Sequence, residues 1–259
     1  MLRSANDLKG LTIGATDGEI GSVQTFYFDD EHWTIRYLVV DTGHWLSGRQ
    51  VLISPFSVRQ IDPVNGRIVV DLTKSQIENS PDIDTHRPIS RQAEIELSRH
   101  YGYPYYWPGP LAWGADPFPV FVPPTPAPDV RDEVQAHIVT QASQDEHLRS
   151  TAEVENYAIH AIDGDIGHVE DFLVDDRAWT IRYLMIDTRN WWPGKKVLIS
   201  PEWIRDVSWA QSHVSVALAR EAIQSAPEYE ADRPIDREYE GRLYAHYGRP
   251  RYWSDRPAA

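Results

Sequence analysis

Two pairs of adjacent aspartates are the residues whose spacing could bind a metal ion. Asp29-Asp30 and Asp175-Asp176 each fall where a turn is expected between two strands. Adjacent carboxylates repel one another unless something neutralises them, and carboxylate oxygens are ligands that Ca²⁺ and Mg²⁺ prefer. A nearby acidic loop, Asp17-Gly18-Glu19-Ile20-Gly21, lacks EF-hand spacing, and Asp-Gly between strands is typical of a hairpin turn. We expect turns at all these positions, with a cation site at the two Asp-Asp pairs as the alternative.

Aromatic residues near the end of each half of the chain suggest a different chemistry, the binding of a partner protein. The motif His-Tyr-Gly-x-Pro-x-Tyr-Trp occupies residues 100–107 and again 246–253. Tyr and Trp dominate the energetics of protein interfaces, so these side chains would form a docking surface if exposed. The set comprises Tyr101, Tyr105, Tyr106, Trp107, Tyr247, Tyr252 and Trp253. The other interpretation, which we favour, is a clasp that fixes a helix to a sheet, with Gly ending the helix and His complementing its dipole.

Neither catalysis nor a cofactor is indicated. The absence of Cys excludes disulfides, thiol nucleophiles and Cys-based metal sites. The sequence contains no Gly-x-Ser-x-Gly motif, P-loop or dinucleotide fingerprint, and no His pair at metal-ligand spacing on an expected helix. Arg36 and Arg182 interrupt apolar strands and could bind an anion, but we favour a structural role on an outer face or beside Asp41 or Asp71. We therefore predict no catalytic residues, no cofactor and no enzyme activity.

An internal repeat positions all of these residues. Residues 2–107 align without a gap to residues 148–253 at an offset of 146, with about 45 identities. Each copy has the size of an ordinary domain. We predict a first domain over 1–107, a linker over 108–147 and a second domain over 148–259.

Each copy reads as six short strands followed by helices. In the first copy the strands are expected over 10–13, 21–28, 34–40, 50–53, 58–61 and 67–72. Their length and spacing predict a small antiparallel barrel, which closes exposed edges. Thr73 to Gln76 predicts a capping box, and the spacing of apolar residues predicts a helix over 90–100 that ends at Gly102. The fold class is mainly β with small α content: two repeated six-stranded antiparallel β-barrels, each followed by short helices.

The segment between the copies differs in composition. Residues 108–128 contain eight of the 19 prolines, which favours an extended spacer over a helix or sheet. Trp113, Phe118 and Phe121 are unusual in a solvated linker, so we expect this part to lie against a domain. Residues 129–147 are acidic and could form a short helix through Val130, Val134 and Ile138.

The motifs of the strand region resemble the PRC-barrel domain over residues 1–72 and 147–218. They are Leu8-x-Gly10, Asp17-Gly18-x-x-Gly21-x-Val23, Trp33-x-x-Arg36-Tyr37-Leu38-Val39-Val40 and Val51-Leu52-Ile53-Ser54-Pro55. That family includes the cytoplasmic domain of the photosynthetic reaction centre H subunit and the C-terminal domain of a ribosome maturation factor. The resemblance implies a six-stranded barrel with a non-catalytic role in assembly, and it supplies no catalytic residues.

Charge and hydropathy restrict the partners. A net charge of −14 disfavours direct nucleic-acid binding, which needs a basic face. No apolar run approaches the ~20 residues of a membrane span, and no signal peptide is recognisable, so we expect a cytoplasmic protein.

Three functions are consistent with these observations. The first is a scaffold that binds another protein. In this interpretation the two copies form an intramolecular pseudo-dimer, and the chain could also form homo-oligomers. The resemblance implies a link to photosynthetic reaction-centre electron transfer. The alternatives are a small-ligand or cation-binding module and a ribosome-assembly factor that contacts a basic protein.

Overall fold

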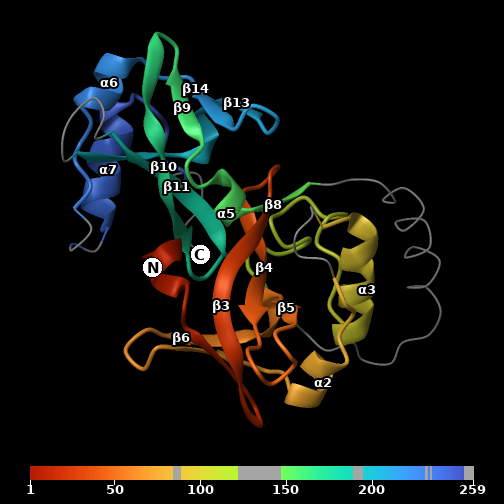
Figure 1. The fold of residues 1–259 in the computed structure, drawn as a ribbon. Coiled ribbons are helices and arrows are strands. Elements are labelled where there is room, and N and C mark those ends of the chain that lie inside the picture. The colour runs from red at the N-terminus through yellow and green to blue at the C-terminus, as the bar shows by residue number, and fades with distance from the viewer. Residues whose placement is uncertain (84–88, 122–146, 189–194, 231–232, 234, 254–259) are drawn as a thin grey trace. The chain divides into compact units, whose positions relative to one another are not determined.

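In the computed structural model, six strands of the first repeat form a sheet in the order β5-β4-β3-β2-β7-β6 (Figure 1). Strands β2 and β7 run parallel, and the other ladders within this set are antiparallel. The short helical turn η1 (Pro55–Ser57) leads from β5 to β6, the two ends of this order. The strands are β2 (Thr12–Ala15), β3 (Gly18–Asp29), β4 (Thr34–Asp41), β5 (Gln50–Ile53), β6 (Val58–Asp62) and β7 (Arg67–Val70).

The structure describes residues 1–83, 89–121, 147–188, 195–230, 233 and 235–253. Within these, the chain forms two compact units. The first contains Met1 and residues 3–152 and 174–181, and the second contains Leu2 and residues 153–173 and 182–259. The boundaries of these compact units differ from those of the repeat, on which the predicted domains are based. The predicted domain boundaries therefore stay a prediction.

Three helices of the first repeat begin where a side chain accepts a hydrogen bond from the first turn. They are α1 (Ala5–Leu8), α2 (Lys74–Glu78) and α3 (Arg91–Tyr101), with N-caps Ser4, Thr73 and Ser90. The predicted capping box at Thr73 and Gln76 is present, and Gly102 ends α3 in a left-handed conformation. The sequence prediction missed α1 and the preceding strand β1 (Leu2–Ser4).

The second repeat contains an equivalent set of strands in the order β12-β11-β10-β9-β14-β13. Here β9 and β14 are the parallel pair. The strands are β9 (Ala158–Ala161), β10 (Gly164–Asp175), β11 (Thr180–Asp187), β12 (Lys196–Ile199), β13 (Ile204–Ser208) and β14 (His213–Val216). The remaining elements are α5 (Thr151–Val154), η2 (Pro201–Trp203), α6 (Arg220–Gln224) and α7 (Arg237–His246).

These strands confirm the mainly β fold class with few helices; the first repeat contains the short strand β1 in addition to six strands, β2 to β7. The prediction that the strands are wholly antiparallel is wrong, because β2 and β7 are parallel. Parallel pairing is possible here because a long connection, which includes β3 to β6, separates the two strands in sequence. Alternation within a strand does not reveal the direction of its neighbour.

Two segments from beyond the first repeat complete the first unit. Strand β8 (Leu148–Ser150) pairs antiparallel with the end of β3, where Leu148 faces Asp29. The turn after β10 approaches the start of β4, where Ile35 N–H donates to the Trp179 carbonyl at 2.7 Å. Local sequence patterns do not predict these contacts, because the paired residues are more than 100 positions apart.

The first part of the linker lies against the first unit, as the sequence predicted. Trp113 is buried, packs edge-on against Phe56 and donates from Nε1 to the Ala178 carbonyl at 2.7 Å. The expected helix within 129–147 lies outside the described residues, apart from His147.

Candidate functional site

A buried arginine connects the elements of the first unit. Arg36, in β4, is only 1% exposed, and its Nε donates to Asp29 Oδ2 at 2.8 Å. Its guanidinium lies over the Tyr106 ring, 3.6 Å from the centroid, and near Trp113. Nη1 donates to the carbonyl of Ala112. One cation therefore ties the β3–β4 turn to the aromatic motif and to the linker.

Tyr106 extends this cluster toward α3. Its hydroxyl donates to Glu94 Oε2 at 2.6 Å, and Arg91 contacts both the hydroxyl and the Glu94 carboxylate. His147 Nε2 lies 3.1 Å from the same hydroxyl oxygen. Because the hydroxyl donates its one hydrogen bond to Glu94, Nε2 is the donor in this second contact. Burial, reinforced by the charge of Glu94, raises the pKa of Tyr106 well above its ordinary value. The hydroxyl thus stays protonated, as a structural donor.

The second unit contains the same cluster in reduced form. Arg182 lies 4.3 Å from the centroid of the Tyr252 ring. The Tyr252 hydroxyl donates to Glu240 at 3.0 Å, and Arg237 contacts both groups. Tyr183 also donates to Glu240, at 2.8 Å. Because both copies contain these contacts, the cluster belongs to the architecture of the repeat.

The aromatic residues singled out in the sequence lie within or beside these clusters. Tyr101, Tyr105, Tyr106 and Tyr247 are buried, and Trp107, Tyr252 and Trp253 are half-buried. His100 and His246 contact the carbonyls of Gln76 and Ala222, joining the long helix to the short one in each copy. The arrangement is that of a clasp between helix and sheet. Direct contact of these rings with a partner stays a prediction.

Three of the four carboxylates predicted to hold a cation lie beside basic groups of the chain. Asp29 pairs with Arg36, Asp30 with Arg149 at 3.4 Å and Asp176 with Arg3 at 2.8 Å. Asp175 accepts the N–H of Arg177. No group of three or more His, Asp or Glu side chains in the described residues is arranged to hold a metal ion. The cation site therefore stays a prediction.

The expected partners of Arg36 were wrong. Asp41 instead accepts from Gln24 and from the backbone of Gly43, and Asp71 pairs with Arg59. Asp17, in the Asp-Gly loop, accepts the Lys74 N–H at 2.7 Å, and Asp163 does the same for Arg220. These loop aspartates therefore bind the starts of α2 and α6.

The contact between His32 and Asp29 makes a pH-dependent contribution to stability. The Asp29 hydrogen bond raises the pKa of His32, with partial opposition from burial. This stabilisation is complete below the unfolded-state pKa of about 6.5 and is lost as the pH rises through the higher folded-state pKa. Since His32 is 41% exposed at its side chain, we expect less than about 1 kcal/mol.

Urea unfolding at several pH values checks this expectation. The wild type should lose stability relative to His32→Asn between about pH 6 and pH 8. Exposed His44 provides the control, because His44→Asn should follow the wild-type profile. Parallel profiles of wild type and His32→Asn would contradict the assignment.

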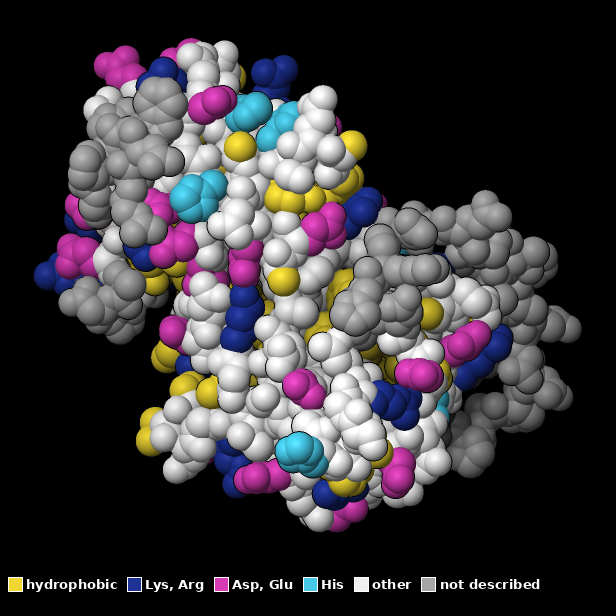
Figure 2. Space-filling view, viewed as in Figure 1, with side chains coloured by type: hydrophobic (Ala, Val, Ile, Leu, Met, Phe, Trp, Pro, Cys, Tyr) yellow, Lys and Arg dark blue, Asp and Glu magenta, His cyan; other side chains and the backbone are white. Residues whose placement is uncertain are grey.

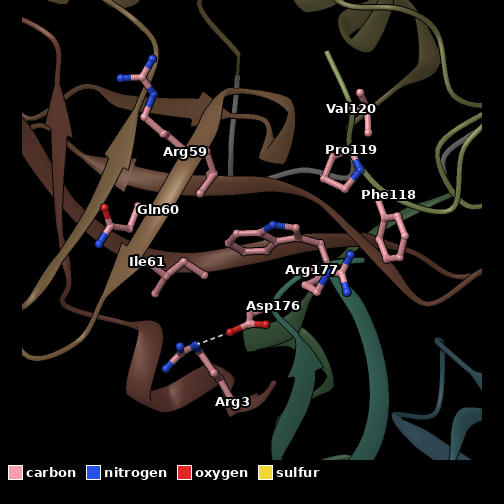
Figure 3. Close-up of a pocket in the computed structure, with 11 residues that line it drawn as sticks. Arg3, Arg59, Gln60, Ile61, Phe118, Pro119, Val120, Asp176 and Arg177 are labelled. Carbon is pink, nitrogen blue, oxygen red and sulfur yellow. Dashed lines mark hydrogen bonds and ion pairs between the residues drawn. The ribbon is translucent and has the colours of Figure 1, made fainter. Parts of the chain in front are cut away.

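A pocket of about 430 Å³ lies in the first unit, among the described residues (Figure 3). It runs beside strand β6 and beneath the linker residues 118–120, and all its lining residues belong to one unit. Trp179 is buried against it, whereas Arg177 and Arg59 are exposed. The lining comprises Arg3, Val58, Arg59, Gln60, Ile61, Phe118, Pro119, Val120, Asp176, Arg177 and Trp179.

The lining of this pocket is basic, although the chain is acidic. It contains three arginines and one carboxylate, and Arg3 neutralises that carboxylate. Arg59 pairs with the exposed Asp71, whereas Arg177 lies 4.7 Å from the centroid of the Phe118 ring and has no ion pair in the described part of the chain. Figure 2 shows acidic and basic side chains intermixed on the face in view. The pocket can therefore receive an apolar group that carries a negative charge.

Sequence reasoning missed this site. Its residues come from four separate segments, and only Asp176 among them was a candidate. The available signal was the run of apolar linker residues that includes Phe118 and Val120, which indicated packing against a domain without indicating where.

Comparison with known families agrees with the strand arrangement. A family model described as the PRC-barrel domain matches residues 2–77, which cover β1 to β7 and the start of α2. This segment of the chain is similar to that family. A search of curated proteins finds no match. Of the helices in the described ranges, none is long and apolar enough to cross a membrane.

Proposed function

We propose that this protein is a non-catalytic module that binds another protein and supports its assembly into a complex. The observation that carries the proposal is the pocket beside β6, where arginines surround apolar side chains in a chain of net charge −14. Depletion of acidic side chains around an apolar centre, with Arg and aromatic groups present, is typical of protein interfaces. The similarity of residues 2–77 to the PRC-barrel domain supports a barrel module of this kind.

The buried clusters support the same proposal in a different way. Arg36, Glu94 and Tyr106 are engaged with one another and with the backbone, so their chemistry is used to hold the fold. A rigid framework reduces the entropy lost on binding a partner. This favours a binding role over a reaction at these groups.

Photo-cross-linking tests the proposal in cells that contain the native partners. A benzophenone amino acid replaces one exposed apolar residue at a time: Val120, Val64 or Ile162. We expect a discrete protein adduct from position 120 and none from position 162, which is 62% exposed and belongs to the second unit, whereas all pocket residues belong to the first. An adduct from one of the other positions alone would support protein binding but would place the binding site elsewhere. Adducts from none of the three would overturn the proposed function.

A small anionic ligand is the second candidate, favoured by the pocket volume. Ligand sites commonly occupy about 300–1,000 Å³ and combine apolar walls with a few polar groups. A thermal-shift screen with aromatic and aliphatic carboxylates would detect such a ligand. A melting temperature that rises with ligand in the wild type, but not in Arg177→Glu, would favour this candidate.

The finer roles implied by the family resemblance are proposals of lower rank. They are participation in a photosynthetic reaction-centre complex and contact with a basic protein during ribosome assembly. Co-sedimentation with membranes or with ribosomal subunits distinguishes them. The intramolecular pairing of the two copies is likewise a proposal, supported by the inclusion of residues 148–152 and 174–181 in the first unit.

A further inference from the structure

Strand β6 has one edge without a strand partner in the part of the chain that the structure describes. Its ladder with β7 occupies the other edge, from Val58 opposite Val70 to Asp62 opposite Arg67. An unpaired edge presents backbone N–H and C=O groups that another extended chain can join. Proteins usually protect such edges with charge or cover, and here Arg59 and Gln60 are both exposed.

The pocket follows this free edge. Four consecutive residues of β6, 58–61, line it. Successive side chains of a strand point to opposite faces of the sheet, so a pocket confined to one face would contact only alternate residues. Contact with four in a row indicates that the pocket runs along the edge of the strand, and β7 already occupies the opposite edge.

The walls across from this edge supply side-chain recognition. Phe118 and Val120 come from the linker, and Trp179 comes from the turn after β10. Arg177 extends beside Phe118 and is the cation of the pocket that has no ion pair among the described residues. In Figure 3 the Phe118 and Arg177 side chains lie together, across the pocket from Gln60 and Ile61.

We propose that the pocket binds an extended, acidic segment of a partner protein, which adds to the edge of β6 as a further strand. The inference rests on the proposed function and specifies its site. Backbone hydrogen bonds to β6 would give affinity, and alternate side chains of the segment would enter the pocket. An apolar side chain packs against Ile61 and Trp179, and an adjacent carboxylate pairs with Arg177. Charge complementarity selects this partner chemistry, because the lining has three arginines and a single, already paired aspartate.

Selection from a random heptapeptide library displayed on phage, with the full chain as target, tests the specificity. We expect enriched peptides to carry Asp or Glu within two residues of Val, Ile, Phe or Tyr. A labelled synthetic copy of the best peptide should bind the Arg177→Glu variant about 10-fold more weakly or worse, as measured by fluorescence polarisation. Arg177→Lys should retain most of the affinity, because it keeps the charge.

The matched control is Arg205→Glu. Arg205 occupies in β13 the position that Arg59 occupies in β6, and both are exposed. This variant introduces the same charge change outside the pocket and should leave the peptide affinity unchanged. Equal weakening by Arg205→Glu and Arg177→Glu would show only a long-range charge effect and would overturn the assigned site.

N-methylated peptides test strand addition without altering the protein. Methylation of alternate backbone nitrogens removes donors on one edge of the peptide only. One of the two alternating versions should therefore lose binding while the other retains it. If both versions bind, the segment docks through side chains alone and the strand-addition proposal is wrong, even where position 120 cross-links to a partner. If no peptide is enriched and no position cross-links, the proposed function also fails.

Discussion

Replacement of Arg36 by methionine is expected to lower the free energy of unfolding by about 3–5 kcal/mol. The substitution leaves Asp29, which is 1% exposed, as a buried charge without its cation. It also removes the contact between the guanidinium and the Tyr106 ring. Urea unfolding, followed by tryptophan fluorescence, measures this loss of free energy as a lower urea midpoint for the unfolding of the first unit.

The same substitution at an exposed pair provides the control. Arg59 and Asp71 form an ion pair in which the side chains are 68% and 50% exposed. Pairs of this kind contribute less than about 1 kcal/mol, so Arg59→Met should have little effect. Equal losses in the two variants would contradict the view that burial of Asp29 makes Arg36 important.

Acid titration separates the charge effect from a simple packing defect. Burial alone would raise the pKa of Asp29, but Arg36 and the hydrogen bonds from His32 bring it below its ordinary value. In the wild type, this contribution is present above about pH 4 and is lost as the pH falls through the lower folded-state pKa. In Arg36→Met, burial without the arginine should raise the pKa of Asp29, so Asp29 of the folded variant should take up its proton at a higher pH than in the wild type.

The destabilisation caused by Arg36→Met should therefore shrink as the solution is acidified. The double variant Arg36→Met with Asp29→Asn should recover part of the loss at pH 7, since the uncompensated charge is gone. A loss that stays constant with pH and is not relieved by Asp29→Asn would indicate a packing defect instead.

The sequence predicted the elements well because their signals are local. The strands over 34–40 and 50–53 agree with β4 and β5 to within one residue. The capping box at Thr73 and the glycine that ends α3 also involve only neighbouring residues. Helix α1 had a comparable signal, because Ser4 accepts from the Asp7 N–H, but its four residues are too few for an apolar periodicity.

The partners of charged residues were harder to predict, because each strand has several carboxylates within reach. Arg36 lies seven positions from Asp29 in sequence, across the β3–β4 turn, and its guanidinium is covered by Tyr106 and Trp113, which are distant in sequence. The pocket shows the same difficulty on a larger scale. Its walls come from residues separated by more than 100 positions, and no local pattern specifies which segments meet.

Gly21→Ala is the other substitution with a large expected effect, about 3 kcal/mol or more. Gly21 has φ +152°, and an added Cβ would lie 1.9 Å from the Asp41 carbonyl oxygen. That oxygen belongs to β4, which is held between β3 and β5, so the backbone has no free direction in which to move. Gly167→Ala should behave alike, because its Cβ would lie 2.0 Å from the Asp187 carbonyl oxygen.

Gly10→Ala separates close approach from conformational preference. Gly10 has φ +79°, but nothing lies within 4 Å of an added Cβ, so only the backbone preference, about 1 kcal/mol, is lost. Thermal unfolding of the three variants should rank Gly10→Ala well above Gly21→Ala and Gly167→Ala in melting temperature. If Gly21→Ala were as stable as Gly10→Ala, the second glycine of the Asp-Gly-x-x-Gly motif would serve only the turn. A large gap would show that this glycine lets two neighbouring strands approach, which explains why the motif contains Gly at a position beyond the turn itself.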